Sequence, residues 1–401
     1  MAGEKVVLAF SGGLDTSFCV PWLKEKGYEV VTLFVDTGGT SDEERAYIEK
    51  RSRDVGAAGH ITVNAAQDLW DEFVVPLVQF GGTYQDQYPM LCSDRYVIVR
   101  KSLEHCRKIG TKNFAHGCTG MGNDQVRFDQ TVRSLGDFRI LSPIRDIQHE
   151  HKQVRAFEAA YLKERGIDVR TSTTKYSINE NILGVTISGS EIDKYDAPDD
   201  DTWKLCVHPS KWPRQRLRVR LGFDKGVPVS VDGERMSGPK MLQKLNQMFG
   251  AYGVGRHIYS SDTTIGLKAR IVFECPGIAA LMHAHRGLEE TIHTAWQAGF
   301  KRAAADWWVQ LVYKGFFYEP LKSDLEAALA SSQRFVTGEV TLETFGGSLC
   351  AVKVDSKHML ERPGASYAQS ADWTVTEAVG FIKLYGQSST ISAMINPIHK
   401  L

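Results

Sequence analysis

The feature that most constrains the fold of this chain is a short apolar run near its N-terminus. Glycine, acidic and hydroxyl residues follow this run directly. The stretch "KVVLAFSGGLDTS" extends from Lys5 to Ser17, and its apolar part, residues 6–10, shows no polar alternation. Such a run is typical of a strand buried on both faces, as in a parallel sheet. The two glycines permit a tight turn, and the acid and hydroxyls after them can begin a helix.

This turn has two interpretations. Backbone N–H groups that converge at a helix N-terminus form an anion site, and phosphate is a frequent occupant of such sites. For a bare Ser-Gly-Gly, a tight turn followed by a capped helix, without any ligand, is the more ordinary explanation. The choice between them depends on the loops at the ends of the other strands of the same sheet.

Strand and helix patterns alternate over the first 170 residues. Further strand patterns lie at 29–35, 61–63, 113–117 and 139–144, and helical patterns at 18–27, 41–56, 66–80, 93–108 and 151–166. Strands that alternate with helices indicate crossover units and a parallel sheet. In such a sheet, ligands bind beyond the carboxyl ends of the strands.

After residue 170 the pattern changes to an α+β type. Strand patterns lie at 216–223 and 226–231, a hairpin pattern at 339–354, and helical patterns at 239–249, 281–297 and 303–314. The change in composition and pattern predicts three parts, residues 1–170, 171–360 and 361–401.

Composition and charge narrow the class of protein. Lys and Arg together number 48, as do Asp and Glu, so the net charge favours neither a nucleic acid nor a membrane partner. The seven cysteines form no C-x-x-C pair, which favours a reducing compartment over a disulfide framework. Neither a signal peptide nor a membrane-spanning apolar run is found. We therefore expect a cytoplasmic globular protein.

A second glycine-rich loop comes after the strand pattern at 113–117. It reads "HGCTGMGNDQVRFD", residues 116–129, and its glycines allow the backbone to approach a ligand closely. Thr119, Asn123, Asp124 and Arg127 supply a hydroxyl, an amide, an anion and a cation. This set suits a zwitterion, with the hydroxyl and amide facing its carboxylate and the acid facing its ammonium. One such loop is weak evidence, but two at one sheet edge support each other.

These motifs resemble those of a known family. "AFSGGLDTS" resembles the ATP pyrophosphatase loop, and "HGCTGMGNDQVRFD" resembles the second signature of the argininosuccinate synthases. The likeness extends through "KYSINEN", "VDGERMS", "LNQMFGAYGVGRH", "LVYKGFFYEP" and "GFIKLY". The first motif is shared with GMP and NAD synthetases and tRNA-thiolating enzymes, whereas the second is specific to this family. The resemblance implies a parallel-sheet, ATP-binding α/β domain at 1–170, an α+β synthetase and multimerisation domain at 171–360, and a C-terminal oligomerisation arm at 361–401.

The resemblance also implies an activity. The family ligates citrulline and aspartate to argininosuccinate at the expense of ATP, in arginine biosynthesis, and releases AMP and pyrophosphate. The ureido oxygen of citrulline attacks the α-phosphate to give a citrullyl-adenylate, and the amine of aspartate then displaces AMP. ATP with Mg²⁺ is implied, as is a homotetramer. Such chemistry needs no enzyme nucleophile, because positioning and stabilisation of phosphate charge suffice.

By the same resemblance, three groups of residues are assigned to the three substrates, and none to a metal. The positions that would bind ATP are Ala9, Phe10, Ser11, Gly12, Gly13, Leu14, Asp15, Thr16, Ser17, Val35 and Gly117. Those that would bind aspartate are Thr119, Asn123 and Asp124. Those that would bind citrulline are Tyr88, Ser93, Asn123, Arg127, Ser177, Thr186 and, by compensation, Asp262.

The match to the family is thinner on the citrulline side. Ser261 stands where a citrulline-binding glutamate is expected, and Phe273 where a tyrosine is expected. One interpretation is that the neighbouring Asp262 restores the acid. Another is a changed ureido substrate, such as an acylated citrulline, which has no ammonium for a carboxylate to pair with. We favour compensation and plain citrulline.

Two further alternatives concern other classes of function. Four arginines, at 214, 216, 218 and 220, share one strand face, and the balanced net charge favours a solvated or interface strand over a nucleic-acid stripe. A non-catalytic nucleotide-binding regulator could keep the fold. The intact "SGGLDTS" and "TGMGND" motifs favour the enzyme, because a regulator would not need the aspartate-binding set.

Overall fold

The computed structural model describes residues 3–168, 176–367 and 369–396. The chain divides into two compact units, one ending at His358 and the other beginning at Met359. The predicted boundary between residues 170 and 171 lies outside the described residues. The division into three domains stays a prediction.

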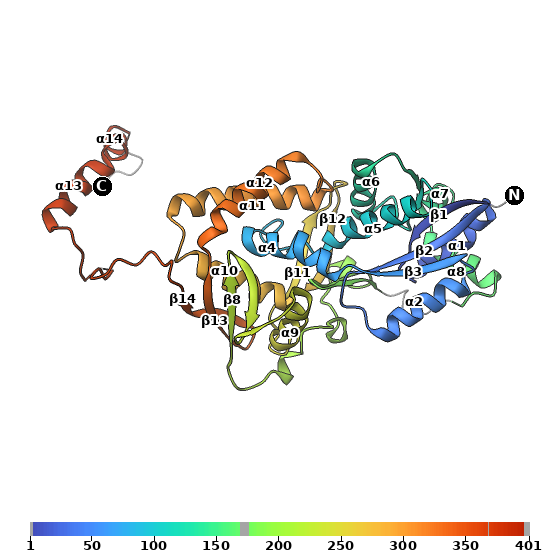
Figure 1. The fold of residues 1–401 in the computed structure, drawn as a ribbon, viewed down its shortest axis with the longest axis horizontal. Coiled ribbons are helices and arrows are strands. Elements are labelled where there is room, and N and C mark those ends of the chain that lie inside the picture. Colours follow the sequence, from blue (N-terminus) through green and yellow to red (C-terminus); the bar gives the residue numbers. More distant parts are fainter. Residues whose placement is uncertain (1–2, 169–175, 368, 397–401) are drawn as a thin grey trace. The chain divides into compact units, whose positions relative to one another are not determined.

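The first unit contains the predicted parallel sheet. It has five strands in the order β3-β2-β1-β4-β5, and all four neighbouring pairs are parallel. The strands are β1 (Glu4–Ala9), β2 (Tyr28–Asp36), β3 (Gly59–Asn64), β4 (Asn113–Ala115) and β5 (Arg139–Leu141). This α/β fold is confirmed, and the strand order puts β1 at the centre of the sheet. Figure 1 labels β1, β2 and β3 of this sheet.

Helices cover both faces of this sheet, which explains the unbroken apolar run in β1. Val6 and Leu8 belong to a core shared with α1, α2, α7 and α8, and Val7 belongs to a second core on the opposite face. The helices are α1 (Leu14–Glu25), α2 (Asp42–Asp54), α5 (Asp94–Lys108), α6 (Asp124–Leu135), α7 (Pro143–Gln148) and α8 (Val154–Glu164).

The helix expected at 66–80 is divided into three pieces. They are α3 (Ala66–Leu69), a π-helical turn (Trp70–Val74) and α4 (Val75–Phe80). Pro76 lacks an N–H and would clash with the carbonyl four residues back in a regular α-helix. The wider turn just before this proline relieves that clash.

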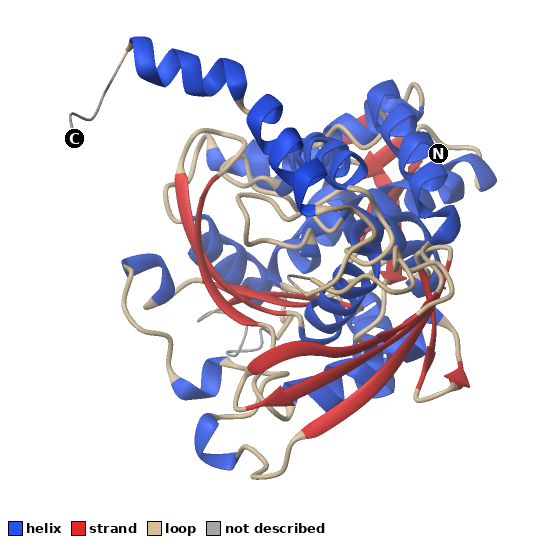
Figure 2. Ribbon diagram, turned by 90° about the vertical axis from the view of Figure 1, so that its left-hand side faces the viewer, coloured by secondary structure: helices blue, strands red, loops and turns tan. Residues whose placement is uncertain are grey.

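Two antiparallel sheets come after the parallel one (Figure 2). The four-stranded sheet has the order β11-β12-β7-β6, and the five-stranded sheet has the order β10-β9-β8-β13-β14. Their strands are β6 (Ser177–Asn181), β7 (Gly184–Ser188), β8 (Leu217–Asp224), β9 (Val227–Val231), β10 (Glu234–Arg235), β11 (Arg256–Asp262), β12 (Lys268–Glu274), β13 (Gly338–Phe345) and β14 (Ser348–Asp355).

Arg218 and Arg220 lie on β8, whereas Arg214 and Arg216 precede the strand, so the four arginines do not share one strand face as expected. Those from residue 216 onward face glutamates of the neighbouring strand β13. Glu343 accepts hydrogen bonds from Arg216 at 3.2 Å and from Arg218 at 2.8 Å, and Arg220 lies 3.7 Å from Glu339. These side chains form an ion-paired sheet face.

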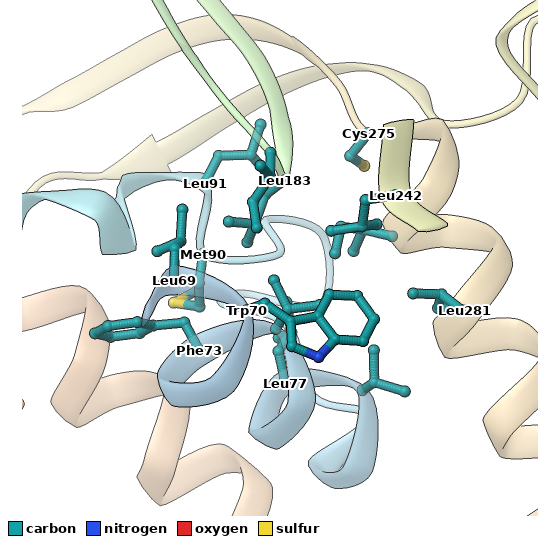
Figure 3. Close-up of a cluster of buried hydrophobic side chains, with 14 of the residues drawn as sticks. Leu69, Trp70, Phe73, Leu77, Met90, Leu91, Leu183, Leu242, Cys275 and Leu281 are labelled. Carbon is teal, nitrogen blue, oxygen red and sulfur yellow. The ribbon is translucent and has the colours of Figure 1, made fainter. Parts of the chain in front are cut away.

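The apolar core on one side of the parallel sheet continues into the antiparallel part of the unit. Figure 3 shows Leu69, Trp70 and Phe73 packed near Leu242 and Leu281, all of which belong to one buried cluster. The helices of this part are α9 (Gly238–Gly250), α10 (Pro276–Glu289), α11 (Ala295–Lys314) and α12 (Pro320–Ser332). The described residues of the parallel and antiparallel parts of the first unit therefore share one apolar core.

The second unit holds two helices, α13 (Val375–Tyr385) and α14 (Gln387–Ile395). Thr374 and Glu377 form a reciprocal capping box at the start of α13. No residue of either helix is buried within this unit. Over the described ranges, no helix of the chain is both long and apolar enough to span a membrane.

Candidate active site

The strand order brings the two glycine-rich loops together. β1 and β4 are neighbours in the sheet although they lie about a hundred residues apart in the chain, so the loops after them meet at the switch point of the topology. A methyl group added to Gly117 would lie only 3.3 Å from the backbone nitrogen of Thr16. The prediction that both loops share one sheet edge is confirmed.

The loop after β1 presents backbone amides at the start of α1. Gly12 has a φ of +73°, a conformation that favours glycine, and Gly13 is the N-cap residue. No side chain caps this helix; the Ser11 hydroxyl accepts only a long hydrogen bond of 3.4 Å from Gly13 N. Asp15 and Thr16 lie in the first turn. An uncapped helix N-terminus with a glycine turn is the arrangement that binds phosphate.

A hydrogen bond from Arg51 and the packing of buried residues fix the position of the loop after β1. Ser17 is buried, its hydroxyl accepts a hydrogen bond of 2.9 Å from Arg51 Nε, and it donates one of 3.4 Å to Gly12 O. Ala9, Phe10 and Leu14 are buried in the cores of the sheet. These residues hold the amides in place through their packing.

The loop after β2 lies at the same edge. Val35 is buried at the end of the strand, and the next residue, Asp36, accepts hydrogen bonds from Gly38 N at 2.9 Å and from Arg45 at 2.7 Å. Ile182 N, in the turn between β6 and β7, donates to the Thr37 carbonyl at 3.1 Å. The antiparallel part of the unit thus contacts the edge of the parallel sheet.

The loop after β4 is held by hydrogen bonds to its own helix and to α7. His116 Nδ1 accepts from Cys118 N at 3.1 Å, so its Nε2–H faces Asp129 at 3.1 Å. Burial lowers the pKa of His116, although Asp129 opposes this effect. Gly120 N donates to Gln148 Oε1 at 2.6 Å. His116 is therefore a neutral, structural histidine of the loop, and Thr119 lies between these fixed points.

Asp124 forms a charge cluster with two arginines. Its Oδ2 accepts from Arg95 at 2.9 and 3.1 Å, and its Oδ1 accepts from Arg127 at 2.9 Å. Burial alone would raise the pKa of Asp124, but the two guanidinium groups outweigh burial and lower it. Arg127 is buried, donates from Nε to the Tyr313 carbonyl at 3.0 Å, and stacks over the Tyr313 ring. The anion and cation expected to face substrates are paired with each other.

Asn123 connects this cluster to the antiparallel part of the unit. Its Oδ1 accepts two hydrogen bonds of 2.8 Å from the backbone N–H and the hydroxyl of Thr264. Its Nδ2 donates to the Tyr313 hydroxyl at 3.1 Å. The side chain does not cap its own helix α6. The Asn123 side chain points away from α6 instead, toward residues that lie far away in the chain.

Stacked aromatic rings line the region where the citrulline positions fall. Tyr84 stacks on Tyr313 with 3.6 Å between ring centroids, and Tyr88 stacks on Tyr259 at 5.6 Å and meets Phe273 edge-on. Tyr88 is buried, which raises the pKa of its phenol well above the usual value. The rings form a rigid, largely apolar wall next to Arg127.

The hydroxyl residues of the predicted citrulline set differ in their environment. The Thr186 hydroxyl on β7 is buried and makes no hydrogen bond of regular geometry among the described residues, but it interacts with the phenol of Tyr88. Ser93 is buried and donates to the Met90 carbonyl at 2.6 Å. Ser177 is exposed at the first position of β6.

Asp262 lies on this side of the site with its carboxylate already engaged. Its oxygens contact Lys268 Nζ at 2.7 Å and Gln85 Nε2 at 3.2 Å, and its side chain is 53% exposed. These contacts lower its pKa, the Lys268 contact having the larger effect. The adjacent Ser261 is buried.

The site contains no metal cage made by protein groups. Among the described residues, no three His, Cys, Asp or Glu side chains converge as metal ligands. Mg²⁺ bound chiefly by phosphate and water needs at most one or two protein carboxylates. The side chains that the structure describes thus do not define an Mg²⁺ site.

Three residues of the site were absent from the predicted set. Arg95 binds Asp124, Thr264 binds Asn123, and Tyr313 contacts both Asn123 and Arg127. Arg95 stands two residues after Ser93 at the start of α5, and its charge beside a predicted site residue was a usable signal. Thr264 and Tyr313 carry no local pattern that distinguishes them.

Comparison with protein families gives matches over nearly the whole chain. A model described as "Arginosuccinate synthase N-terminal HUP domain" matches residues 5–168, and one described as "Arginosuccinate synthase C-terminal domain" matches residues 176–392.

Curated relatives agree with these matches. A protein from Xanthomonas campestris named argininosuccinate synthase is 55% identical over 99% of this chain and 100% of its own length. A protein of the same name from Xylella fastidiosa is 54% identical over 99% of this chain and 99% of its own length. Another from Hyperthermus butylicus is 38% identical over 97% of this chain and 98% of its own length.

Among solved structures, a tRNA methyltransferase subunit from Methanocaldococcus jannaschii aligns with 41% of this chain and 90% of its own. The sequence identity is 16% and the TM-score is 0.28, which is too weak a likeness to support any inference.

Proposed function

The chain belongs to the argininosuccinate synthase family, and from this premise we propose that it ligates citrulline and aspartate through a citrullyl-adenylate. The ureido oxygen of citrulline would attack the α-phosphate of ATP and expel pyrophosphate. The amine of aspartate would then attack the ureido carbon, expel AMP and lose a proton, giving argininosuccinate. Since the relatives are named as this enzyme, the class is an enzyme and not a non-catalytic regulator.

One observation carries this proposal. The uncapped start of α1 lies against Gly117, and the loop from Gly117 continues within a few residues to Asn123, Asp124 and Arg127. A nucleotide held by the first loop would therefore have its phosphates beside groups suited to amino-acid substrates. Catalysis would consist of positioning the three substrates and stabilising phosphate charge with fixed backbone dipoles.

We assign the residues to the substrates as the family resemblance implies. The loop from Ala9 to Ser17, with Val35 and Gly117, would bind ATP, for which the HUP domain of the family is suited. Thr119, Asn123 and Asp124 would bind aspartate. Asn123 would also contact citrulline, as would Tyr88, Ser93, Arg127, Ser177 and Thr186. The compensating role predicted for Asp262 is a separate question, because its carboxylate contacts Lys268. Mg²⁺, a cytoplasmic location, a homotetramer and a multimerising C-terminal arm stay predictions.

A test of the order of steps separates this function from others. Exchange of labelled pyrophosphate into ATP should require citrulline but not aspartate, and release of AMP should require all three substrates. Exchange that needs aspartate, or that proceeds without citrulline, would exclude a citrullyl-adenylate.

The observation on Asp262 supports a second candidate substrate. A free citrulline brings an ammonium, and the carboxylate of Asp262, next to Ser261 in the chain, is already paired with Lys268. An acylated citrulline has no ammonium to pair and would need no acid here. Pyrophosphate release assayed with citrulline and with N-acetylcitrulline decides between the two. We retain plain citrulline as the first candidate, because the relatives carry the name of the enzyme that uses it.

A further inference from the structure

The carboxamide of Asn123 is held by contacts that fix its orientation. The backbone nitrogen and the hydroxyl of Thr264 each lie 2.8 Å from Oδ1, and the Tyr313 hydroxyl lies 3.1 Å from Nδ2. Because an amide can be turned by 180° without a change of shape, its partners must decide which end is the oxygen. A backbone N–H can only donate a hydrogen bond. The atom that faces Thr264 must therefore be the oxygen.

We propose that Thr264 is a positioning residue, which holds the Asn123 carboxamide with its N–H groups, and not its oxygen, toward the amino-acid substrates. The proposal rests on the proposed function, in which Asn123 contacts aspartate and citrulline. Nδ2 carries two hydrogens, and the Tyr313 hydroxyl takes one of them. The other is left for an acceptor, either a substrate carboxylate or a ureido oxygen.

The turn that carries Thr264 is organised by its neighbour. Thr263 N and Oγ1 both donate to the Leu267 carbonyl at 2.8 Å, and Leu267 N donates to Thr263 Oγ1 at 3.0 Å. These bonds close the turn between β11 and β12 and leave the N–H and hydroxyl of Thr264 directed at Asn123. The two threonines thus have separate tasks, since one shapes the turn and the other contacts the site.

This division of tasks supplies a matched pair of variants. Thr264→Val removes one of the two donors to Asn123 and keeps the shape, so we expect the KM for aspartate and for citrulline to rise about 5- to 10-fold with kcat within about twofold. Thr264→Ser keeps the hydroxyl and should stay within about twofold of the wild type. Thr263→Val removes a hydroxyl from the same turn without touching Asn123, and should change KM by less than about threefold. An equal effect of Thr263→Val and Thr264→Val would attribute the change to a loosened turn and overturn the proposal.

A double-mutant cycle then asks whether Thr264 acts through Asn123. In an Asn123→Ala background, Thr264→Val should have no further effect on KM. If the valine raises KM by the same factor in both backgrounds, or has no effect in the wild type, the proposal is wrong. A separate result bears on the proposed function, because Asn123→Ala with both KM values unchanged would show that Asn123 contacts neither amino acid.

A last variant tests the orientation itself. Asn123→Asp can accept both hydrogen bonds from Thr264, but it has no N–H to offer a substrate. It should raise both KM values at least as much as Asn123→Ala does. If Asn123→Asp binds the amino acids as well as the wild type, the donor role of Nδ2 is excluded. Circular dichroism and melting temperature confirm that each variant is folded before its kinetics are interpreted.

Discussion

The loop proposed to bind the nucleotide and the residues proposed to bind the amino acids are built in different ways, and are called the nucleotide side and the amino-acid side below. The nucleotide side consists mainly of backbone amides in the loop after β1, which no side chain caps. The amino-acid side consists of side chains that already bind one another, as Asp124 does with Arg95 and Arg127. A ligand of the first side meets free donors, whereas a ligand of the second side must compete with, or add to, existing ion pairs and hydrogen bonds. Selectivity can therefore be set on the second side, because a substrate that replaces these bonds poorly leaves charges unpaired.

The largest effect is expected from filling the turn of the nucleotide side. Gly12→Val would force a β-branched residue into a φ of +73° with Ile48 only 3.1 Å from its Cβ, and should reduce citrulline-dependent pyrophosphate exchange by roughly 100-fold or more. Gly13→Ala is the matched control, since its Cβ would meet nothing closer than 3.4 Å; it should lose less than about 10-fold. Equal losses in the two variants would show that the rate of pyrophosphate exchange does not depend on the backbone conformation of this turn.

On the amino-acid side, Asp124→Ala should separate the two half-reactions. If Asp124 serves aspartate, overall ligation should fall by roughly 100-fold, about 3 kcal/mol in transition-state terms, while exchange of pyrophosphate into ATP continues. Some loss of stability should accompany it, because the variant leaves two guanidinium groups without their shared carboxylate. Comparable losses in exchange and ligation would instead place Asp124 in the first step.

Beneath the nucleotide side, a buried acid makes stability depend on pH. Glu158 on α8 is fully buried, and burial followed by the charge of Asp15 raises its pKa well above the usual range. The folded state therefore keeps a proton that the unfolded state releases above about pH 4.3, so this group lowers stability as pH rises. Glu158→Gln should increase the melting temperature, and the gain should grow from about pH 5 to about pH 9.

The control for this prediction lies on the same helix. Glu164 is exposed, and Glu164→Gln makes the same change of side chain at the surface, so it should change the melting temperature by less than Glu158→Gln does. A gain for Glu158→Gln that does not change with pH would show that Glu158 is not held in its protonated form.

The smallest effect on activity is expected from a substitution of Asp262, on the amino-acid side of the site. Its carboxylate is paired with Lys268 at an exposed position, so, against the compensation expected from the sequence, Asp262→Asn should change the KM for citrulline by less than about threefold. If the carboxylate turns to the substrate ammonium instead, the KM should rise about 10- to 150-fold. Ser261→Glu adds the missing acid beside the aromatic wall, and it should favour free citrulline over an acylated form if the pocket has changed its substrate.

The two sides also differ in how far the sequence could predict them. The nucleotide side is local, because "SGGLDTS" joins a buried strand to a helix and its amides are placed by that geometry. The amino-acid side depends on which distant elements pack together. Thr264 reaches Asn123 across 141 positions of the chain, and nothing in the sequence near either residue indicates that contact.

The fold shows the same division between local and distant information. The parallel sheet was predicted from alternating patterns, and the helix expected at 239–249 is α9, but the two helices expected after it were placed imprecisely. The pattern at 281–297 predicted one helix, whereas α10 ends at Glu289 and α11 begins at Ala295. The signal for that boundary was present, since Thr294 and Gln297 form a capping box. Continuous apolar periodicity on both sides of the break concealed it.

The core that continues from the parallel sheet into the antiparallel part has a consequence for unfolding. Leu69 and Trp70 precede Leu242 and Leu281 by more than 150 residues, yet all four belong to one buried cluster. Neither part can lose its structure without exposing apolar surface of the other, so residues 3–358 should melt in one cooperative transition. A fragment that stops before residue 169 would leave the apolar side chains of α3 and α4 in water. We expect such a fragment to aggregate rather than to bind ATP as a free-standing domain.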